Sequence, residues 1–171
     1  MTKKPGHHGL RFCIKRKIGL FAFMVSLNLP PFNYTLKRES DRVFILDIIR
    51  KKYLVLTPEE WVRQHFIHYL ITDLRYPRSL IKVEGGLRFN ELQKRSDIVV
   101  FSRKGAPWMV IECKAPDQKL SQRTLHQASV YNHSLQAKYL TVTNGMMHIC
   151  CEVDWIAGKT AMLDSLPEYI N

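Results

Sequence analysis

Two carboxylates and one ammonium group interrupt a mostly apolar part of the sequence. Asp97 comes first, and Glu112 and Lys114 follow further along, two positions apart. Residues two apart on a strand project from one face, roughly 6–7 Å apart along the backbone. Burying such charges is costly unless they pair with each other or bind a metal ion. The spacing therefore fits a metal site, and it also fits a Glu112–Lys114 ion pair at a strand end with Asp97 as a turn residue.

A β-hairpin is the element that must position these side chains. Two apolar runs, 97–102 and 108–114, are joined by a basic turn that contains Gly105, which is typical of a hairpin. Nearly every position in the runs is apolar, so both strands are expected to be covered on both faces. A turn centred near Gly105 places Asp97 across from residues 112–114, and directly opposed residues lie about 4.5–5.5 Å apart. The hairpin thus predicts that the three charges converge.

This pattern resembles a known nuclease core. Asp97, then a hairpin, then Glu-Cys-Lys at 112–114 is similar to the D…ExK arrangement of PD-(D/E)xK nucleases. The longer strings KRSD at 94–97 and IECKAP at 111–116 resemble the N-terminal nuclease domain of type I restriction enzyme R subunits. The resemblance implies a restriction-endonuclease-like core and a metal-dependent endonuclease that hydrolyses phosphodiester bonds of DNA.

The resemblance also implies roles for individual residues. Asp97 and Glu112 would supply hard oxygen ligands for Mg²⁺, with Mn²⁺ as a substitute, and the backbone carbonyl of Cys113 would be another ligand. The metal would neutralise phosphate charge and lower the pKa of a bound water. Lys114 would orient or deprotonate the attacking water, or stabilise the pentavalent phosphate. A base role would require the pKa of Lys114 to fall.

The clearest helix signal in the chain opens at Thr57. Thr57 fits the N-cap, Pro58 fits the first helical position and Glu60 completes a capping box. Apolar residues then keep the helical period until Pro77. Nucleases of the resembled class often carry an acidic residue on the helix before the core sheet, so Glu60 is also a candidate metal ligand. The capping box accounts for Glu60 without a metal, and both interpretations stay open.

A second helix is predicted over 121–136, after the core hairpin. Gln127 and Tyr131 are four positions apart and therefore lie on one face. A Gln-x-x-x-Tyr pair on this helix resembles a motif of the R-subunit family, which implies that the pair positions the DNA backbone or the region of Lys114. The alternative is a core tyrosine beside a surface glutamine. Arg95, next to the core hairpin, is a further candidate for steering phosphate.

The remaining elements predict an α/β fold. Three further β segments are expected: a hairpin over 32–56, a strand over 80–84 and a hairpin over 138–153 that turns at Asn144-Gly145. A short helix is expected within 163–170. The order of elements predicts a mixed central β-sheet flanked by helices, with an N-terminal β-hairpin.

Three parts are expected along the chain: an N-terminal basic and apolar extension over 1–26, a nuclease domain over 27–152 and a C-terminal tail over 153–171. The net charge is +11, and six of these charges come from residues 1–23, which contain no acids. The body of the protein is therefore only mildly basic, as expected for a DNA partner.

The extension has features of a targeting segment. Its basic residues and short apolar run are typical of a signal peptide, but no small-x-small cleavage site follows. The apolar run is too short to span a bilayer, so no membrane association is expected. A cytoplasmic location is predicted, with secretion as the alternative. Met1 and Met24 are both candidate starts.

The cysteines and a glycine-lysine-threonine string exclude a disulfide-linked protein and a nucleotide site. Cys150 and Cys151 are adjacent and Cys113 lies in a presumed buried strand, which fits reduced cysteines in a cytosolic protein. Gly158-Lys159-Thr160 mimics the end of a Walker A loop, but Val153 stands where that motif needs glycine. No nucleotide site is predicted.

The sequence therefore favours a metal-dependent DNA endonuclease domain that lacks the ATP-driven translocase of full R subunits. Cleavage would occur without that translocase, or with separately encoded restriction-system subunits as partners. The alternative is a non-catalytic nucleic-acid-binding module that retains the nuclease fold. DNA sequence preference and oligomeric state stay open.

Overall fold

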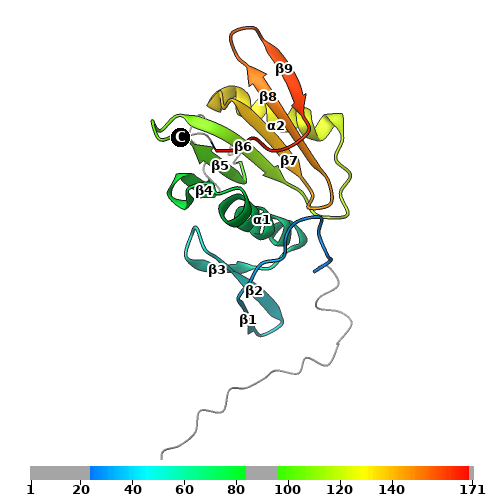
Figure 1. Ribbon diagram of the computed structural model, residues 1–171. Helices are drawn as coiled ribbons and strands as arrows, with labels where there is room; N and C mark the ends of the chain where they lie inside the picture. The colour runs from blue at the N-terminus through cyan, green and yellow to red at the C-terminus, as the bar shows by residue number, and fades with distance from the viewer. Residues whose placement is uncertain (1–23, 84–95, 170–171) are drawn as a thin grey trace, which may run out of the picture.

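In the described part of the chain, two β-sheets and two α-helices stack in alternating layers (Figure 1). The structure is a computed structural model and describes residues 24–83 and 96–169. Helix α1 lies between a small N-terminal sheet and a larger central sheet, and helix α2 covers the other face of the central sheet. The predicted α/β fold with a mixed central sheet flanked by helices is confirmed.

The N-terminal sheet contains one strand more than the predicted hairpin. Its strands, in the order β1-β2-β3, are all antiparallel. They are β1 (Leu36–Glu39), β2 (Arg42–Asp47) and β3 (Lys52–Val55). Val43 and Ile45 of β2 are buried in the core shared with α1. Their alternation with more exposed neighbours shows that one face of this sheet packs on the helix.

Helix α1 (Pro58–His68) begins as the sequence predicts. The Thr57 side chain accepts a hydrogen bond from the backbone of Glu60, and a π-helical turn over Tyr69–Asp73 follows the helix. All residues from 60 to 67 are buried. Because sheets cover α1 on two sides, its polar positions are enclosed along with its apolar ones.

The central sheet has six strands in the order β4-β5-β6-β7-β8-β9. Its strands are β4 (Ile81–Val83), β5 (Ile98–Phe101), β6 (Pro107–Cys113), β7 (Tyr139–Thr143), β8 (His148–Asp154) and β9 (Lys159–Leu163). Neighbouring strands are antiparallel except β6 and β7, which run parallel. A parallel pair needs a crossover, and α2 supplies it. A 3-10 turn, η2 (Arg78–Leu80), leads into β4.

Helix α2 (Gln122–Leu135) forms the crossover. Ser121 caps its start by accepting from the backbone of Thr124, and Gln136 ends it in a left-handed conformation. Strand residues alternate between two cores. Ile98 and Ile111 belong to the cluster that includes α1, whereas Val99 and Val110 belong to the cluster that includes α2. The prediction that β5 and β6 are covered on both faces is confirmed.

The C-terminal part differs from the expectation. The helix expected within 163–170 is wrong for the residues that the structure describes, because Leu163 ends strand β9 and residues 164–169 contain no helix. The expected division at residue 152 falls inside β8. Beyond β9, the chain returns to the core, where Tyr169 contacts the rings of Tyr76 and Trp108.

Some expectations fall outside the described residues, namely the N-terminal extension up to residue 23 and Arg95. Within 24–83 and 96–169, no helix is long and apolar enough to cross a membrane. The described cysteines are free thiols and all are buried: Cys113, Cys150 and Cys151.

Candidate active site

The β5–β6 hairpin brings Asp97 and Glu112 together. Its register pairs Ile98 with Ile111, so one further step outward sets Asp97 across from Glu112, as predicted. Gly105 lies in the connecting turn with a φ of +81°, a backbone angle that glycine adopts readily. Burial raises the pKa of Glu112, and the charge of Asp97 raises it further. The two carboxylates are therefore close enough to repel each other.

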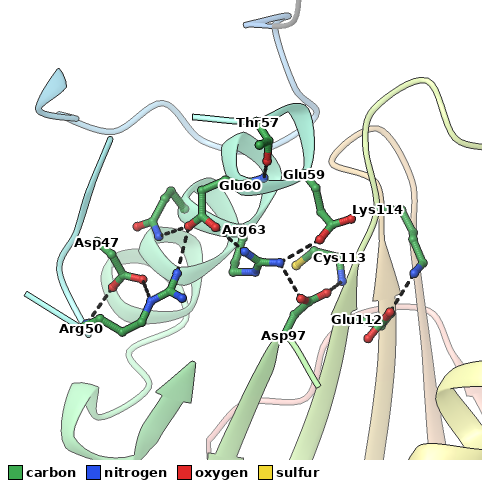
Figure 2. Close-up of polar contacts among 11 residues, drawn as sticks. Asp47, Arg50, Thr57, Glu59, Glu60, Arg63, Asp97, Glu112, Cys113 and Lys114 are labelled. Carbon is green, nitrogen blue, oxygen red and sulfur yellow. Dashed lines mark hydrogen bonds and ion pairs between the residues drawn. The ribbon is translucent and has the colours of Figure 1, made fainter. Parts of the chain in front are cut away.

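Asp97 is held by hydrogen bonds at both carboxylate oxygens (Figure 2). Oδ1 accepts from Nη2 of Arg63 on helix α1 at 2.5 Å, and Oδ2 accepts from the backbone N–H of Cys113 at 2.7 Å. Only 13% of the Asp97 side chain is exposed. Asp97 is thus a fixed, nearly buried anion that links β5, β6 and α1, and its contacts exceed those of a simple turn residue.

Glu112 and Lys114 form the ion pair that the spacing suggested. Nζ of Lys114 lies 2.7 Å from Oε1 of Glu112, and each side chain is about a quarter exposed. The backbone of Lys114 donates to the carbonyl of Thr143 on β7, which fixes the end of β6. This pair lies at the strand end but beside a third charge, Asp97, which contributes to the pKa of both side chains.

Strand alternation indicates which face of the sheet carries the Glu112 side chain. Ile111 and Cys113 pack in the core on the α1 side, so Glu112, between them, is directed toward the α2 side. On α2, Gln127 is exposed and Tyr131 is half-buried against the core on that side. The supporting role of Gln127 and Tyr131 stays a prediction.

Glu60 does not complete the predicted capping box. The Thr57 hydroxyl accepts from the backbone of Glu60 at 3.0 Å, which is the first half of the motif. The Glu60 carboxylate instead accepts from Arg50, Arg63 and Gln64 (Figure 2). Burial explains this outcome, because a carboxylate enclosed between the N-terminal sheet and α1 requires cationic and amide partners.

Glu59, a residue that the sequence reasoning missed, faces the core hairpin. Its Oε1 lies 2.9 Å from Nη2 of Arg63, the same nitrogen that binds Asp97. Burial and the charge of Asp97 raise the pKa of Glu59, while Arg63 and Lys114 oppose this shift. Adjacent helix positions differ by about 100° in direction, so Glu59 and Glu60 cannot both point the same way. The spacing of Glu59 and Arg63, four apart, was the available signal.

The two cations of the site are both held in the charged form. Burial lowers the pKa of Arg63, but the charges of Asp97 and Glu60 outweigh burial and raise the pKa above its ordinary value. Burial also lowers the pKa of Lys114, and the hydrogen bond and charge of Glu112 raise it by more. Each central carboxylate is therefore paired with a cation of the protein.

The carboxylates of the site fit a hard divalent cation that takes few of its ligands from the protein and keeps water as the others. Within the part of the chain that the structure describes, no three acidic, histidine or cysteine side chains form a ready metal site. Mg²⁺ usually binds one or two carboxylates and retains several waters. Asp97 and Glu112 are two mutually repelling carboxylates beside each other on the β5–β6 hairpin, which meets that smaller requirement.

Comparison with known proteins gives one family and one solved structure of note. Residues 58–167 match the family described as type I restriction enzyme R protein N terminus. The chain is also similar to a fragment structure from Vibrio vulnificus YJ016, described as an HsdR subunit of a type I restriction enzyme. The two are 28% identical with a TM-score of 0.35, over 51% of this chain and 16% of that chain. No curated protein matches.

Proposed function

Because the chain belongs to the family of the type I restriction enzyme R protein N terminus, we propose that it is a metal-dependent DNA endonuclease domain. One observation supports this most: the β5–β6 hairpin sets Asp97 opposite Glu112, with Lys114 bonded to Glu112. Two neighbouring, partly buried carboxylates repel each other, so a function that requires paired carboxylates accounts for their position.

Asp97 and Glu112 would hold the metal, together with the backbone carbonyl of Cys113. Mg²⁺ suits these oxygen ligands, and Mn²⁺ would substitute. When bound, the ion would neutralise negative charge on the phosphate and lower the pKa of a bound water. Glu59 replaces Glu60 as the candidate helix carboxylate, because Glu59 lies beside Asp97 and Lys114, whereas Glu60 binds Arg50 and Gln64.

Lys114 would act as a cation toward the scissile phosphate. Its raised pKa keeps it protonated at neutral pH, which favours donation to a phosphate oxygen over removal of a proton from water. About a quarter of the side chain is exposed, so Lys114 can turn from Glu112 to a substrate oxygen. Glu112 would then be released to bind the metal.

Residues outside the hairpin would position DNA. Glu112 is directed toward the α2 side of the sheet, and the exposed Gln127 and half-buried Tyr131 are on that helix. We assign them, with Arg95, to contact with the DNA backbone. Other restriction-system subunits are proposed as partners, since the chain belongs to a family of restriction enzyme R proteins.

A plasmid assay tests this function. Supercoiled DNA would be incubated with wild-type protein and with Asp97→Asn, Glu112→Gln and Lys114→Met variants, in Mg²⁺, Mn²⁺ or excess chelator. We expect nicking in both metals, none in chelator, and a loss of roughly 100-fold or more in each variant, because each removes a ligand or the phosphate cation. Asn and Gln are chosen over Ala to preserve shape and hydrogen bonding.

The matched control is Glu152→Gln, because Glu152 pairs with Lys138 at 3.0 Å on the exposed surface and repeats the chemistry of the Glu112–Lys114 pair elsewhere. This variant should nick at the wild-type rate. Wild-type activity in the Glu112→Gln variant would contradict the proposal. Salt-sensitive DNA binding without nicking would instead support a non-catalytic nucleic-acid-binding module.

A further inference from the structure

A continuous row of charge contacts connects the N-terminal sheet to Asp97 (Figure 2). The carboxylate of Asp47, at the end of β2, lies 2.6 Å from Nε of Arg50, and Nη2 of Arg50 lies 3.2 Å from Oε1 of Glu60. Oε2 of Glu60 binds Nη1 of Arg63, and Nη2 of Arg63 binds Asp97 at 2.5 Å. Acids and arginines alternate along the whole row.

The members of this row are fixed by burial and by several bonds each. The side chains of Asp47, Glu60 and Arg63 are all less than a tenth exposed. Asp47 also accepts from the backbone N–H groups of Ile49 and Arg50, at 2.7 and 2.8 Å. These contacts leave the row little freedom to rearrange, so its last member, Arg63, is presented to Asp97 in one orientation.

Asp97 needs such an anchor because it lies just outside strand β5. Its backbone is beyond the last ladder pair, Ile98 with Ile111, so the sheet alone does not fix its side chain. The two bonds from Arg63 and the Cys113 backbone define the carboxylate plane. A carboxylate has about four lone-pair sites, so the remaining lone pairs stay free for a metal in a set direction.

We propose that Arg63 is the positioning residue of Asp97, and that Asp47, Arg50 and Glu60 of the N-terminal sheet and α1 hold it in place. This inference rests on the proposed nuclease function. It gives the small sheet a role in the chemistry beyond packing. The forked guanidinium is required, because Arg63 binds Glu60 with one terminal nitrogen and Glu59 and Asp97 with the other.

Three variants test the row at different points: Arg63→Lys, Arg63→Met and Glu60→Gln. Mn²⁺ affinity would be measured by titration calorimetry without DNA, and plasmid nicking would be measured against metal concentration. Lys keeps the charge but cannot bridge Glu60 and Asp97 at once. We expect Arg63→Lys to lose roughly 10- to 100-fold in Mn²⁺ affinity or nicking rate, the usual effect of removing a partner of a metal ligand.

Glu60→Gln is the decisive variant because Glu60 does not contact Asp97. It should weaken Mn²⁺ binding in the same direction as Arg63→Lys, by roughly 10-fold, and Arg63→Met should lose at least as much as Arg63→Lys. The control is Arg42→Met, since Arg42 is exposed at the β1–β2 turn, and it should keep wild-type values. Thermal unfolding of every variant distinguishes loss of the fold from loss of positioning.

The outcomes separate this inference from the proposed function. Wild-type Mn²⁺ affinity and nicking in both Arg63→Lys and Glu60→Gln, in a protein that nicks DNA, would overturn the positioning role alone. A wild-type protein that neither binds Mn²⁺ nor nicks would overturn the function and the inference together. If Arg63→Met does not fold, Arg63→Lys and Glu60→Gln decide the matter.

Discussion

At the scale of single residues, the two central carboxylates differ in the cation that each is paired with. Asp97 is paired with Arg63, of which 7% of the side chain is exposed, and Glu112 is paired with Lys114, of which 24% is exposed. The enclosed cation is fixed by other acids, whereas the exposed cation can leave its partner. In the proposed function, Lys114 is therefore the cation assigned to the substrate, and Arg63 is the one that stays with Asp97.

The raised pKa of Glu112 predicts how this residue affects stability. Burial, and then Asp97, raise its pKa above the ordinary value of 4.5, so the folded protein holds this proton more tightly than the unfolded chain does. Stability therefore falls as pH rises from about 4.5 through the folded pKa. Because Gln cannot ionise, Glu112→Gln should gain stability relative to wild type between pH 4 and pH 7.

Urea unfolding at pH 4 and pH 7, without divalent metal, measures this difference. Glu152→Gln is again the control, since Glu152 is on the exposed surface, and its difference from wild type should change little. A Glu112→Gln variant whose relative stability falls toward pH 7 would show that the Lys114 pair outweighs burial and repulsion.

At the scale of elements, the β7–β8 turn contacts both the N-terminal segment and helix α1. Gly145 has a φ of +80°, and a Cβ built there would lie 2.8 Å from Leu27 and 3.2 Å from Val62 of α1. Its carbonyl also accepts from the backbone of Asn28 at 2.7 Å. The turn thus fixes the N-terminal segment against the helix that carries Arg63.

Gly145→Ala should destabilise the protein by about 2–3 kcal/mol, as the sum of left-handed backbone strain and overpacking against Leu27. Gly105→Ala separates the two causes, because Gly105 has nearly the same φ of +81° and nothing within 4 Å of its Cβ position. It should cost only about 1–2 kcal/mol. Equal losses for the two variants in urea unfolding would mean that packing at Gly145 contributes nothing.

At the scale of the whole molecule, the C-terminal segment closes the fold over the central sheet. Strand β9 pairs with β8 along its length. Beyond it, the Tyr76 hydroxyl donates to the carbonyl of Pro167 at 2.5 Å, and the Tyr169 hydroxyl donates to the carbonyl of Phe101 at 3.2 Å. Tyr76, almost fully buried, and Trp108 both contact the Tyr169 ring.

Removal of residues 159–171 should therefore destabilise the protein by at least about 3 kcal/mol. It leaves the hydroxyl of Tyr76 without its acceptor and uncovers an aromatic cluster. Tyr169→Phe is the matched variant, because it removes one hydrogen bond and keeps the ring, and it should cost about 1 kcal/mol. A shortened chain with the wild-type urea midpoint would show that this segment is not part of the fold.

The sequence by itself determined the local features. Apolar runs, a glycine turn and two capping residues depend on neighbours in the chain, so the core hairpin, the starts of both helices and the opposition of Asp97 and Glu112 could be predicted from spacing. The membership of residues 159–169 in the fold could not, because it depends on partners such as Tyr76 that are distant in sequence.

Only the tertiary structure decided which polar residues of α1 face the site. Thr57 and Glu60 fit a capping pattern, yet the Glu60 carboxylate binds Arg50 and Arg63, while Glu59 binds the Arg63 nitrogen that also binds Asp97. The contacts of Glu60 depend on α1 being enclosed between two sheets, because a buried carboxylate requires partners. Glu59, with 42% of its side chain exposed, pairs with Arg63 on the same helix. Sequence spacing placed the carboxylates of the hairpin and the Glu112–Lys114 pair, and packing of the helix against the hairpin determined what holds Asp97.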